Sequence, residues 1–312
     1  MAIDAASSLG SDFAGVLTPE DSAPIFENAA RQSVVQRLVP QVPLNYNGRR
    51  IPVVTDKPTA SWVGEGAEKP KTSGGMDMRY MEPHKLASIV VVSAELVRAN
   101  PGNYMSLIRD QLAEAFASAF DSAALHNTES PFDTAVSQTS KTQALGESGQ
   151  AQGSVYADLN DALGQLVRSE KKLTGWALDT ITEPILNAAV DLNGRPLFIE
   201  APYEDSNVTL RPGRLLGRNA FIGEGVSGPN QVVGFGGDWS KARWGVIGGI
   251  NYDVSQEASV TIGGQLTSLW ERNLVAVRAE AEYGFVVGDT EAFVTLTSTE
   301  ASAGTGAAEG NL

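Results

Sequence analysis

The chain contains no cysteine and only two histidines, His84 and His126. Without cysteine it cannot build a disulfide framework, a thiolate metal site or a cysteine nucleophile. Two histidines leave almost no material for a catalytic triad or a histidine-rich metal centre. No run approaches the roughly 18 continuous apolar residues of a membrane span, and the first residues lack the basic and apolar regions of an export signal, so we expect a cytosolic product.

Basic residues are missing from both ends of the chain. Residues 1–30 hold five acidic residues and residues 279–312 hold six, with no base in either segment. The middle then carries 26 acidic against 23 basic residues, although the whole chain has a net charge of −14. A nearly neutral middle can approach copies of itself with little Coulomb repulsion, and no basic stripe for phosphate binding is visible. Direct nucleic-acid binding is therefore disfavoured, and acidic ends that aid solubility are the simplest interpretation of the charge.

The length of 312 residues suggests two modest domains or one elaborated domain. Helices and strands alternate without a regular strand–helix–strand order, which predicts an α+β fold. The helices are predicted at residues 22–38, 103–126, 158–172 and 182–193, the second being long enough to act as a spine. Strands are predicted at residues 86–93, 196–200, 208–210, 231–235, 242–254, 259–262, 285–287 and 292–297.

Residues 55–85 form the most unusual segment of the chain, since they are rich in glycine, proline and charges of both signs. Two strand-like runs, at residues 60–63 and 76–81, predict a long hairpin. Such a hairpin is too polar to bury its own large apolar side chains, which are Trp62, Met76, Met78 and Tyr80. These side chains need a surface outside the hairpin, which either the same domain or another chain can supply.

Catalytic motifs are not found. No Gly-x-Ser-x-Gly nucleophile elbow occurs, and the glycine-rich run at residues 234–238 lacks the Gly-Lys-Ser/Thr ending of a phosphate loop, so we predict a turn between two strands there. Acidic pairs such as Glu65 and Glu68 are interpreted as solvated charges. His126 is expected near the C-terminal end of the long helix, where a partial positive charge suits the helix dipole. We therefore predict no catalytic, cofactor-binding or metal-binding residue and no enzyme activity.

Several runs recur in one order along the chain. They are ASWVGEGAEKP at residues 60–70, HKLASIVVVSAEL at 84–96, DSAAL at 121–125, NGRPL at 193–197, VVGFGGD at 232–238 and NLVAVRAE at 273–280. Together they resemble the major capsid proteins of tailed double-stranded-DNA bacteriophages, which have the Hong Kong 97 fold. The resemblance covers roughly residues 20–297, and the colinear set is more specific than any single motif.

The resemblance implies a division of the α+β chain. An N-terminal arm is expected at residues 1–54 and an extended hairpin loop at 55–85. A peripheral domain built on the spine helix is expected at 86–153 and 241–283, an axial domain at 154–240 and 284–297, and a flexible tail at 298–312. The hairpin loop would lie across a neighbouring subunit. The expected interface residues are Trp62, Glu65, Glu68, Lys69, Met76, Met78, Arg79 and Tyr80.

The resemblance also implies a function, that of a structural subunit of the icosahedral head shell. Copies of the chain, as pentamers and hexamers, would enclose double-stranded DNA without sequence-specific binding, with no cofactor and no membrane. Portal, scaffolding and decoration proteins are further candidate partners, and the subunit would pass from the host cytoplasm into the virion. An arginine, Arg79, stands where some members carry a cross-linking lysine, so no covalent cross-link is predicted. Two alternatives remain open, a shell subunit of an encapsulin-like compartment and a carboxylate-based hydrolase.

Overall fold

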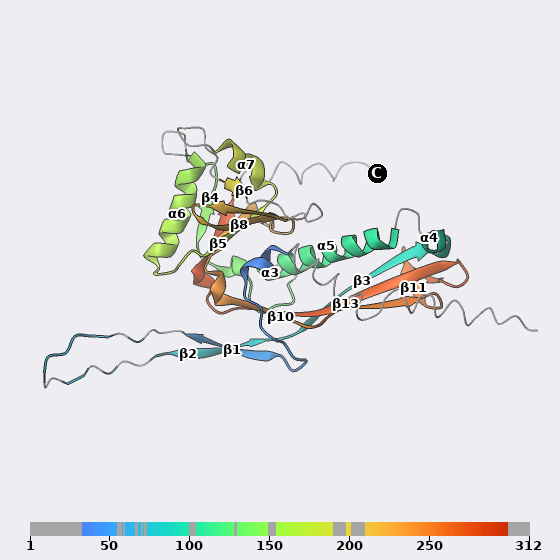
Figure 1. The fold of residues 1–312 in the computed structure, drawn as a ribbon, viewed down its shortest axis with the longest axis horizontal. Coiled ribbons are helices and arrows are strands. Elements are labelled where there is room, and N and C mark those ends of the chain that lie inside the picture. The colour runs from blue at the N-terminus through green and yellow to red at the C-terminus, as the bar shows by residue number, and fades with distance from the viewer. Residues whose placement is uncertain are drawn as a thin grey trace, which may run out of the picture.

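The computed structural model describes residues 33–54, 58, 60–65, 68–69, 71, 74–99, 104–127, 130–148, 154–189, 198–200 and 210–298. These residues form a mixed α/β fold with two sheet-based units. A long helix, α5 (Tyr104–Leu125), extends along one unit toward the other, and the two-stranded hairpin of β1 (Arg49–Val54) and β2 (Met76–Met81) projects away from the body (Figure 1).

One unit is built on a three-stranded antiparallel sheet in the order β10–β13–β3. Its strands are β10 (Ala242–Ser255), β13 (Leu274–Val287) and β3 (His84–Ser93). Helix α5 matches the predicted spine at 103–126 to within one residue at each end, and its apolar side chains pack on this sheet because alternate residues of β13 point toward it. The short helix α4 (Ala94–Ala99) follows β3, and a small hairpin of β11 (Ser259–Ile262) and β12 (Gln265–Ser268) precedes β13.

The other unit is a seven-stranded sheet in the order β4–β14–β9–β5–β8–β7–β6. Its strands are β4 (Thr142–Ala144), β14 (Phe293–Thr297), β9 (Val232–Gly237), β5 (Gly175–Asp179), β8 (Arg218–Gly223), β7 (Arg211–Leu215) and β6 (Phe198–Glu200). The pairs β4–β14 and β5–β8 are parallel and the other pairs are antiparallel. Helices α6 (Ser154–Arg168) and α7 (Thr182–Ala188) cover one face, and single turns of 3-10 helix lie at Val136–Gln138, Trp239–Lys241 and Thr290–Ala292.

The glycine-rich run at 234–238 is not the predicted turn, because residues up to Gly237 belong to the buried strand β9. A Cβ atom at Gly236 would stand 2.4 Å from Cζ3 of Trp176, and one at Gly234 would stand 2.8 Å from the carbonyl oxygen of Ala177. The glycines are needed because the Trp176 indole and the backbone of the neighbouring strand β5 lie directly against β9. They serve close packing and not a change of direction.

Two helices have ends that differ from the prediction. Helix α6 begins at Ser154 and ends at Arg168, so Lys171 lies beyond it and is not in its last turn. Helix α7 ends at Ala188, where Ala189 turns to an extended backbone and donates its N–H to Leu186. The left-handed stop expected at 193–194 lies outside the described residues, as do the start of the helix expected at 22 and the tail after residue 298.

A single hydrophobic cluster joins the two units. It contains Phe120 of α5 and Phe285 of β13, and from the seven-stranded sheet Ala177, Phe235 and Phe293. A second cluster, on the opposite face of the seven-stranded sheet, packs beneath α6 and α7. Because the first cluster draws on both sheets and the spine helix, burying it fixes the units against one another.

Residues 33–48, which we call the strap, run between these elements. The strap opens with the short helix α3 (Val34–Leu38), which contacts α5, β5 and β8. Its first turn is held by the fully buried carboxylate of Asp121, which accepts hydrogen bonds from the Ser33 hydroxyl at 2.6 Å and from the backbone amides of Val34 and Val35 at 2.7 and 3.1 Å. Burial raises the pKa of Asp121 to about 7, against the lowering effect of these donors.

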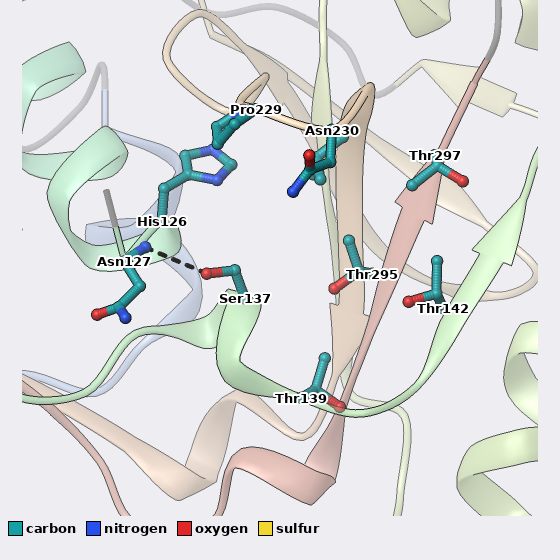
Figure 2. A pocket seen from close by; sticks show the side chains of 10 residues that line it. His126, Asn127, Ser137, Thr139, Thr142, Pro229, Asn230, Thr295 and Thr297 are labelled. Atoms are coloured by element: carbon teal, nitrogen blue, oxygen red, sulfur yellow. Dashed lines mark hydrogen bonds between the residues drawn. The ribbon is translucent and has the colours of Figure 1, made fainter. Parts of the chain in front are cut away.

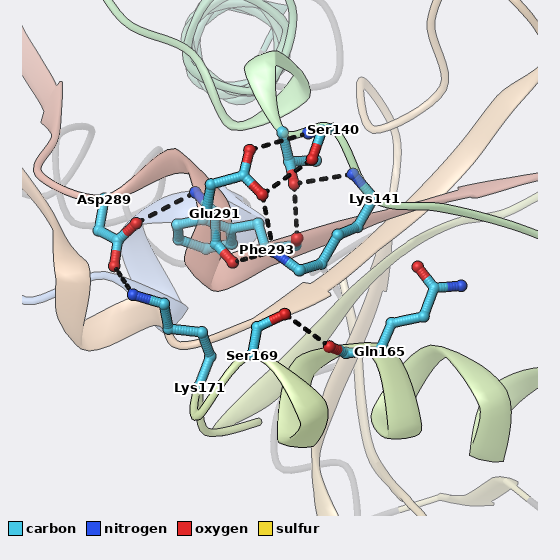
Figure 3. Close-up of polar contacts among 9 residues, drawn as sticks. Ser140, Lys141, Gln165, Ser169, Lys171, Asp289, Glu291 and Phe293 are labelled. Atoms are coloured by element: carbon cyan, nitrogen blue, oxygen red, sulfur yellow. Dashed lines mark hydrogen bonds and ion pairs between the residues drawn. The ribbon is translucent and has the colours of Figure 1, made fainter.

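Polar contacts hold the turn between β13 and β14 (Figure 3). The Lys141 ammonium lies 2.8 Å from Oε2 of Glu291 and donates to the Glu291 carbonyl oxygen, while Ser140 donates to the same carboxylate. Lys171 pairs with Asp289 at 2.5 Å. The hydrogen bonds from Lys141 and Ser140 lower the pKa of Glu291 to about 2. The segment before β4 and the residues that follow α6 are thereby fixed to this turn.

Replacing Asp121 by asparagine tests the buried anchor. Because the pKa of Asp121 is higher in the folded chain than in the unfolded chain, its stabilising contribution is complete below about pH 4 and is lost as the pH rises through about 7. We expect the free energy of unfolding of the natural chain to fall relative to that of Asp121→Asn over this interval, measured by urea denaturation of the unassembled subunit. A difference between the two chains that stays constant with pH would contradict this assignment.

Candidate functional site

The hairpin exists as predicted, but its first strand is different. Strand β2 pairs antiparallel with β1, from Arg49 opposite Met81 to Val54 opposite Met76. Residues 60–63, predicted as the first strand, lie in the loop beyond β1 without strand structure. The burial of β1 alternates with period two. A tight turn at Asn47 and Gly48 precedes this strand. Tyr80 lies over the turn, and its hydroxyl donates to the Asn47 carbonyl oxygen at 2.5 Å.

The hairpin has two chemically different faces, because residues opposite each other in an antiparallel pair share a face. One face carries Ile51 and Met81, which are buried against the subunit's own three-stranded sheet, and further out Arg79. The other face, which we call the outer face, consists of Arg50, Pro52, Val54, Met76, Met78 and Tyr80. On the outer face, Met76 is 68% exposed and Val54 and Met78 are more than half exposed. The subunit therefore leaves an apolar strip of this hairpin uncovered.

The predicted interface residues are distributed over three places. Met76, Met78 and Tyr80 come together on the outer face. Arg79 lies on the opposite face, with its Nε atom 3.6 Å from the carboxylate of Asp77.

The remaining predicted residues lie in the loop past the strands. The Trp62 side chain is completely exposed in the single chain. The charged residues Glu65, Glu68 and Lys69 are exposed in the same loop. The loop therefore places one large aromatic side chain among charges of both signs.

The hairpin is attached to the body at a pair of glycines, Gly245 of β10 and Gly284 of β13, which lie directly opposite each other. A Cβ atom at Gly245 would stand 2.7 Å from the Val42 carbonyl oxygen and 2.9 Å from Cβ of Leu44, and one at Gly284 would stand 2.8 Å from Cδ2 of Leu44. Leu44 and Met81 occupy the space that the missing side chains leave. The glycine pair thus lets the strap and the base of the hairpin pack directly on the sheet backbone.

Sequence reasoning missed part of this site. Arg50, Pro52 and Val54 fall in the segment predicted as the arm, and proline and two adjacent arginines weaken the strand signal there. The period-two pattern of this run was the signal that could have found them. Gly245 and Gly284 carried no local signal, since their partner Leu44 is distant in the sequence.

The described residues offer no arrangement for catalysis. A pocket of about 390 Å³ beside the end of α5 is lined mostly by threonine, serine and asparagine, together with His126 (Figure 2). The His126 ring is buried, and its Nε2 atom lies 2.9 Å from the carbonyl oxygen of Val226. Burial lowers the pKa of His126 in spite of this bond. Burial therefore works against the positive charge expected at the helix end, and this side chain links α5 to the loop before β9.

Metal sites and membrane-spanning helices are absent from the part of the chain that the structure describes. It contains no group of three histidine, aspartate or glutamate side chains placed to hold a metal ion. None of its helices is both long and apolar enough to cross a membrane. The outer face of the hairpin and the loop around Trp62 are thus its most distinctive surface.

Comparison with known proteins gives concordant matches. The model of the phage capsid family matches residues 14–298. The probable major capsid protein gp17 of Mycobacterium phage L5 is 44% identical over 299 residues, which are 93% of this chain and 91% of that protein.

Solved structures match the fold as well. A chain from Mycobacterium phage Cain has a TM-score of 0.67 at 18% identity, covering 86% of this chain and 90% of that one. A chain from the capsid of an empty GTA particle, computed with C5 symmetry, has a TM-score of 0.58 at 17% identity, with coverage of 86% and 90%.

Replacing Gly245 by alanine tests the attachment of the hairpin. The added methyl group meets a backbone carbonyl at 2.7 Å, which cannot move as cheaply as a side-chain end. We expect a loss of about 1–3 kcal/mol in the free energy of unfolding, measured by calorimetry. The matched control is Gly164→Ala, where no atom lies within 4 Å of the new Cβ. That helical site is expected to gain up to about 1 kcal/mol. Equal stabilities of the two variants would contradict the packing described.

Proposed function

The chain belongs to the phage capsid family, as a Hong Kong 97-like major capsid protein that forms the shell of a phage head, and we propose that its β1–β2 hairpin joins neighbouring subunits of that shell. The family is one of structural proteins and not of enzymes, and the protein's place is the virion capsid. The sequence left two alternatives open, an encapsulin-like compartment and a carboxylate-based hydrolase. The match to the phage capsid family supports neither of them.

The outer face of the hairpin is the observation that carries this proposal. Val54, Met76 and Met78 are each more than half exposed, side by side on one face of a two-stranded ribbon. A contiguous apolar strip in water is unfavourable by roughly 25 cal/mol for each Å² left uncovered, and exposed strips of this kind mark interaction sites. A second copy of the chain is the partner that a closed shell supplies.

The loop beyond the strands supports the same reading. Trp62 offers a large aromatic side chain, which is a typical anchor at protein interfaces. Glu65, Glu68 and Lys69 around it carry charges of both signs. We propose that Trp62 and the outer face form the apolar centre of the contact and that these charges form its polar rim.

We further propose that the three-stranded unit with α5 is the peripheral domain and that the seven-stranded unit is the axial domain. In this division the arm, hairpin, peripheral, axial and tail segments keep the order expected from the sequence. Strand β4 pairs with β14, so residues 142–144 fall with the axial domain, and β13 pairs with β10 up to Val287, so residues 284–287 fall with the peripheral domain. The axial units would meet as pentamers and hexamers, in line with the C5 symmetry of the related GTA particle.

The shell would enclose double-stranded DNA without sequence-specific binding. The nearly neutral middle of the chain supports this, since tight phosphate binding needs an excess of basic side chains. A portal, a scaffolding protein and a decoration protein are proposed as additional partners.

Deleting residues 64–75 tests the role of the hairpin loop. The residues of this loop that the structure describes lie outside both strands and all three hydrophobic clusters, so we expect a folded subunit with an unchanged circular dichroism spectrum. Particle yield, counted by negative-stain electron microscopy after expression, should fall at least about tenfold because the intersubunit contact is lost. Unchanged particle yield would show that the loop does not join subunits.

The double substitution of Met76 and Met78 by threonine tests the outer face alone. Because both side chains are exposed in the single subunit, its free energy of unfolding should change by no more than about 0.5 kcal/mol. Shell assembly should nevertheless fall, as measured by sedimentation. The control Leu266→Thr removes an exposed apolar side chain from β12, outside the hairpin, and should assemble normally. Equal assembly of the two variants would argue against a contact through the outer face.

A further inference from the structure

Helix α6 carries an unusual line of residues on its solvent side. Tyr156, Asn160, Gly164 and Val167 follow at helical spacing, and we call them the α6 stripe. Tyr156 is 50% exposed and Val167 is 60% exposed, although the opposite side of the same helix supplies Leu159, Ala162 and Leu166 to the core. The stripe contains no charge, which is uncommon on the solvent side of a helix.

Gly164 lies in the middle of this stripe and is not explained by the subunit itself. A Cβ atom there would meet nothing within 4 Å, so packing within the chain does not require glycine. Its φ angle is also ordinary for a helix, and glycine in a helix interior is less stable than alanine. A glycine kept at such a position allows another backbone or a large side chain to come close to the helix.

The charges beside the stripe are acidic in its N-terminal half. Asp161 is exposed on α6, one turn after Asp158. Asp158 accepts hydrogen bonds from the Gly146 amide and the Ser148 hydroxyl, which holds the exposed Glu147 next to the start of the helix. Two exposed carboxylates, those of Asp161 and Glu147, thus accompany Tyr156 on this side of the seven-stranded unit.

The other side of the same unit has the opposite character. Strand β6 is one edge of the sheet and β7 is next to it. Helix α6 packs over β4, β14 and β9, near the other edge. Ile199 of β6 is 64% exposed, and it is aligned with Arg214 of β7 in the strand register. Arg218 of β8 is also exposed, but its register partner is the buried Leu215, so it lies on the other face of the sheet. We call Ile199 and Arg214 the arginine edge.

We propose that the α6 stripe of one subunit packs on the arginine edge of the next copy, in a head-to-tail contact around the ring of axial units. The two surfaces lie on opposite sides of the seven-stranded unit, which a heterologous contact that closes into a ring requires. They also match in chemistry. Tyr156 and Val167 face an exposed isoleucine, Gly164 admits its approach, and Asp161 and Glu147 face Arg214. This inference rests on the proposed shell function and identifies a contact separate from the hairpin.

Charge reversal tests the pairing. Asp161→Arg and Arg214→Glu should each reduce shell yield at least tenfold, and the double variant should recover most of it, because the reversed pair is again complementary. The matched control Lys172→Glu reverses an exposed charge beyond the end of α6 and should leave the yield unchanged. Failure of the double variant to recover, with all subunits folded, would overturn the contact.

Gly164→Gln separates assembly from folding. Glutamine is a good helix former, so the subunit's melting temperature should stay the same or rise by about 2 °C. Its long side chain should block the neighbour and lower shell yield. A variant that is equally stable and assembles as well as the natural chain would count against the proposal.

The absence of cysteine allows a direct measurement on assembled particles. Shells of the double variant Asp161→Cys and Arg214→Cys, treated with a short bis-maleimide cross-linker, should give a ladder of covalent oligomers that continues beyond the dimer in a denaturing gel. Each single-cysteine variant should remain monomeric. Shells of normal appearance that yield no ladder would overturn the head-to-tail contact but leave the hairpin proposal intact. A clear ladder, together with normal assembly of the hairpin variants, would support the head-to-tail contact and contradict the hairpin proposal.

Discussion

The packing of Leu44 and Met81 into the space beside Gly245 and Gly284 determines how the hairpin leaves the body of the subunit. Side chains at either glycine would lift the hairpin from the sheet. With the glycines in place, the base of the ribbon is buried on its inner face and its outer face is turned away from the subunit. The exposed apolar strip is therefore a consequence of the way the hairpin is attached, since the inner face is the one that the subunit covers.

The strap connects this attachment to the rest of the fold. It begins on the buried carboxylate of Asp121 and packs α3 on both the spine helix and the seven-stranded sheet. It then crosses β10, where Val42 donates its amide to the Trp244 carbonyl oxygen, and continues into β1. A displacement of the seven-stranded unit relative to the spine would thus be transmitted to the root of the hairpin. The shared hydrophobic cluster resists such a displacement because both sheets contribute to it.

Local sequence patterns were sufficient to predict the helices and strands that have a clear hydrophobic periodicity. The spine helix has an apolar face over its whole length, and the second strand of the hairpin alternates methionine and tyrosine with charged residues. The sequence also predicted that the hairpin itself cannot bury Trp62, Met76 and Met78, but it left open whether the same domain or another chain covers them; in the single subunit they are exposed. The family resemblance added the order of the segments and the shell function.

Features that depend on contacts between distant parts of the chain could not be predicted in this way. The glycines of β9 looked like a turn because the indole of Trp176 that requires them is on another strand. The partner of β2 was misassigned because Pro52 and two arginines weaken the signal of β1, and the correct pairing becomes clear only from the strand register. Gly245 and Gly284 were unremarkable in the sequence for the same reason.

Hydroxyl-radical footprinting, read by mass spectrometry at single residues, tests the central claim most directly. The oxidation rates of Met76, Met78 and Trp62 are compared between the unassembled subunit and the assembled shell, with the exposed Tyr46 of the strap as an internal reference. The account predicts fast oxidation of all three in the free subunit and strong protection in the shell. Oxidation that is equally fast in both states would show that no neighbouring subunit covers the hairpin.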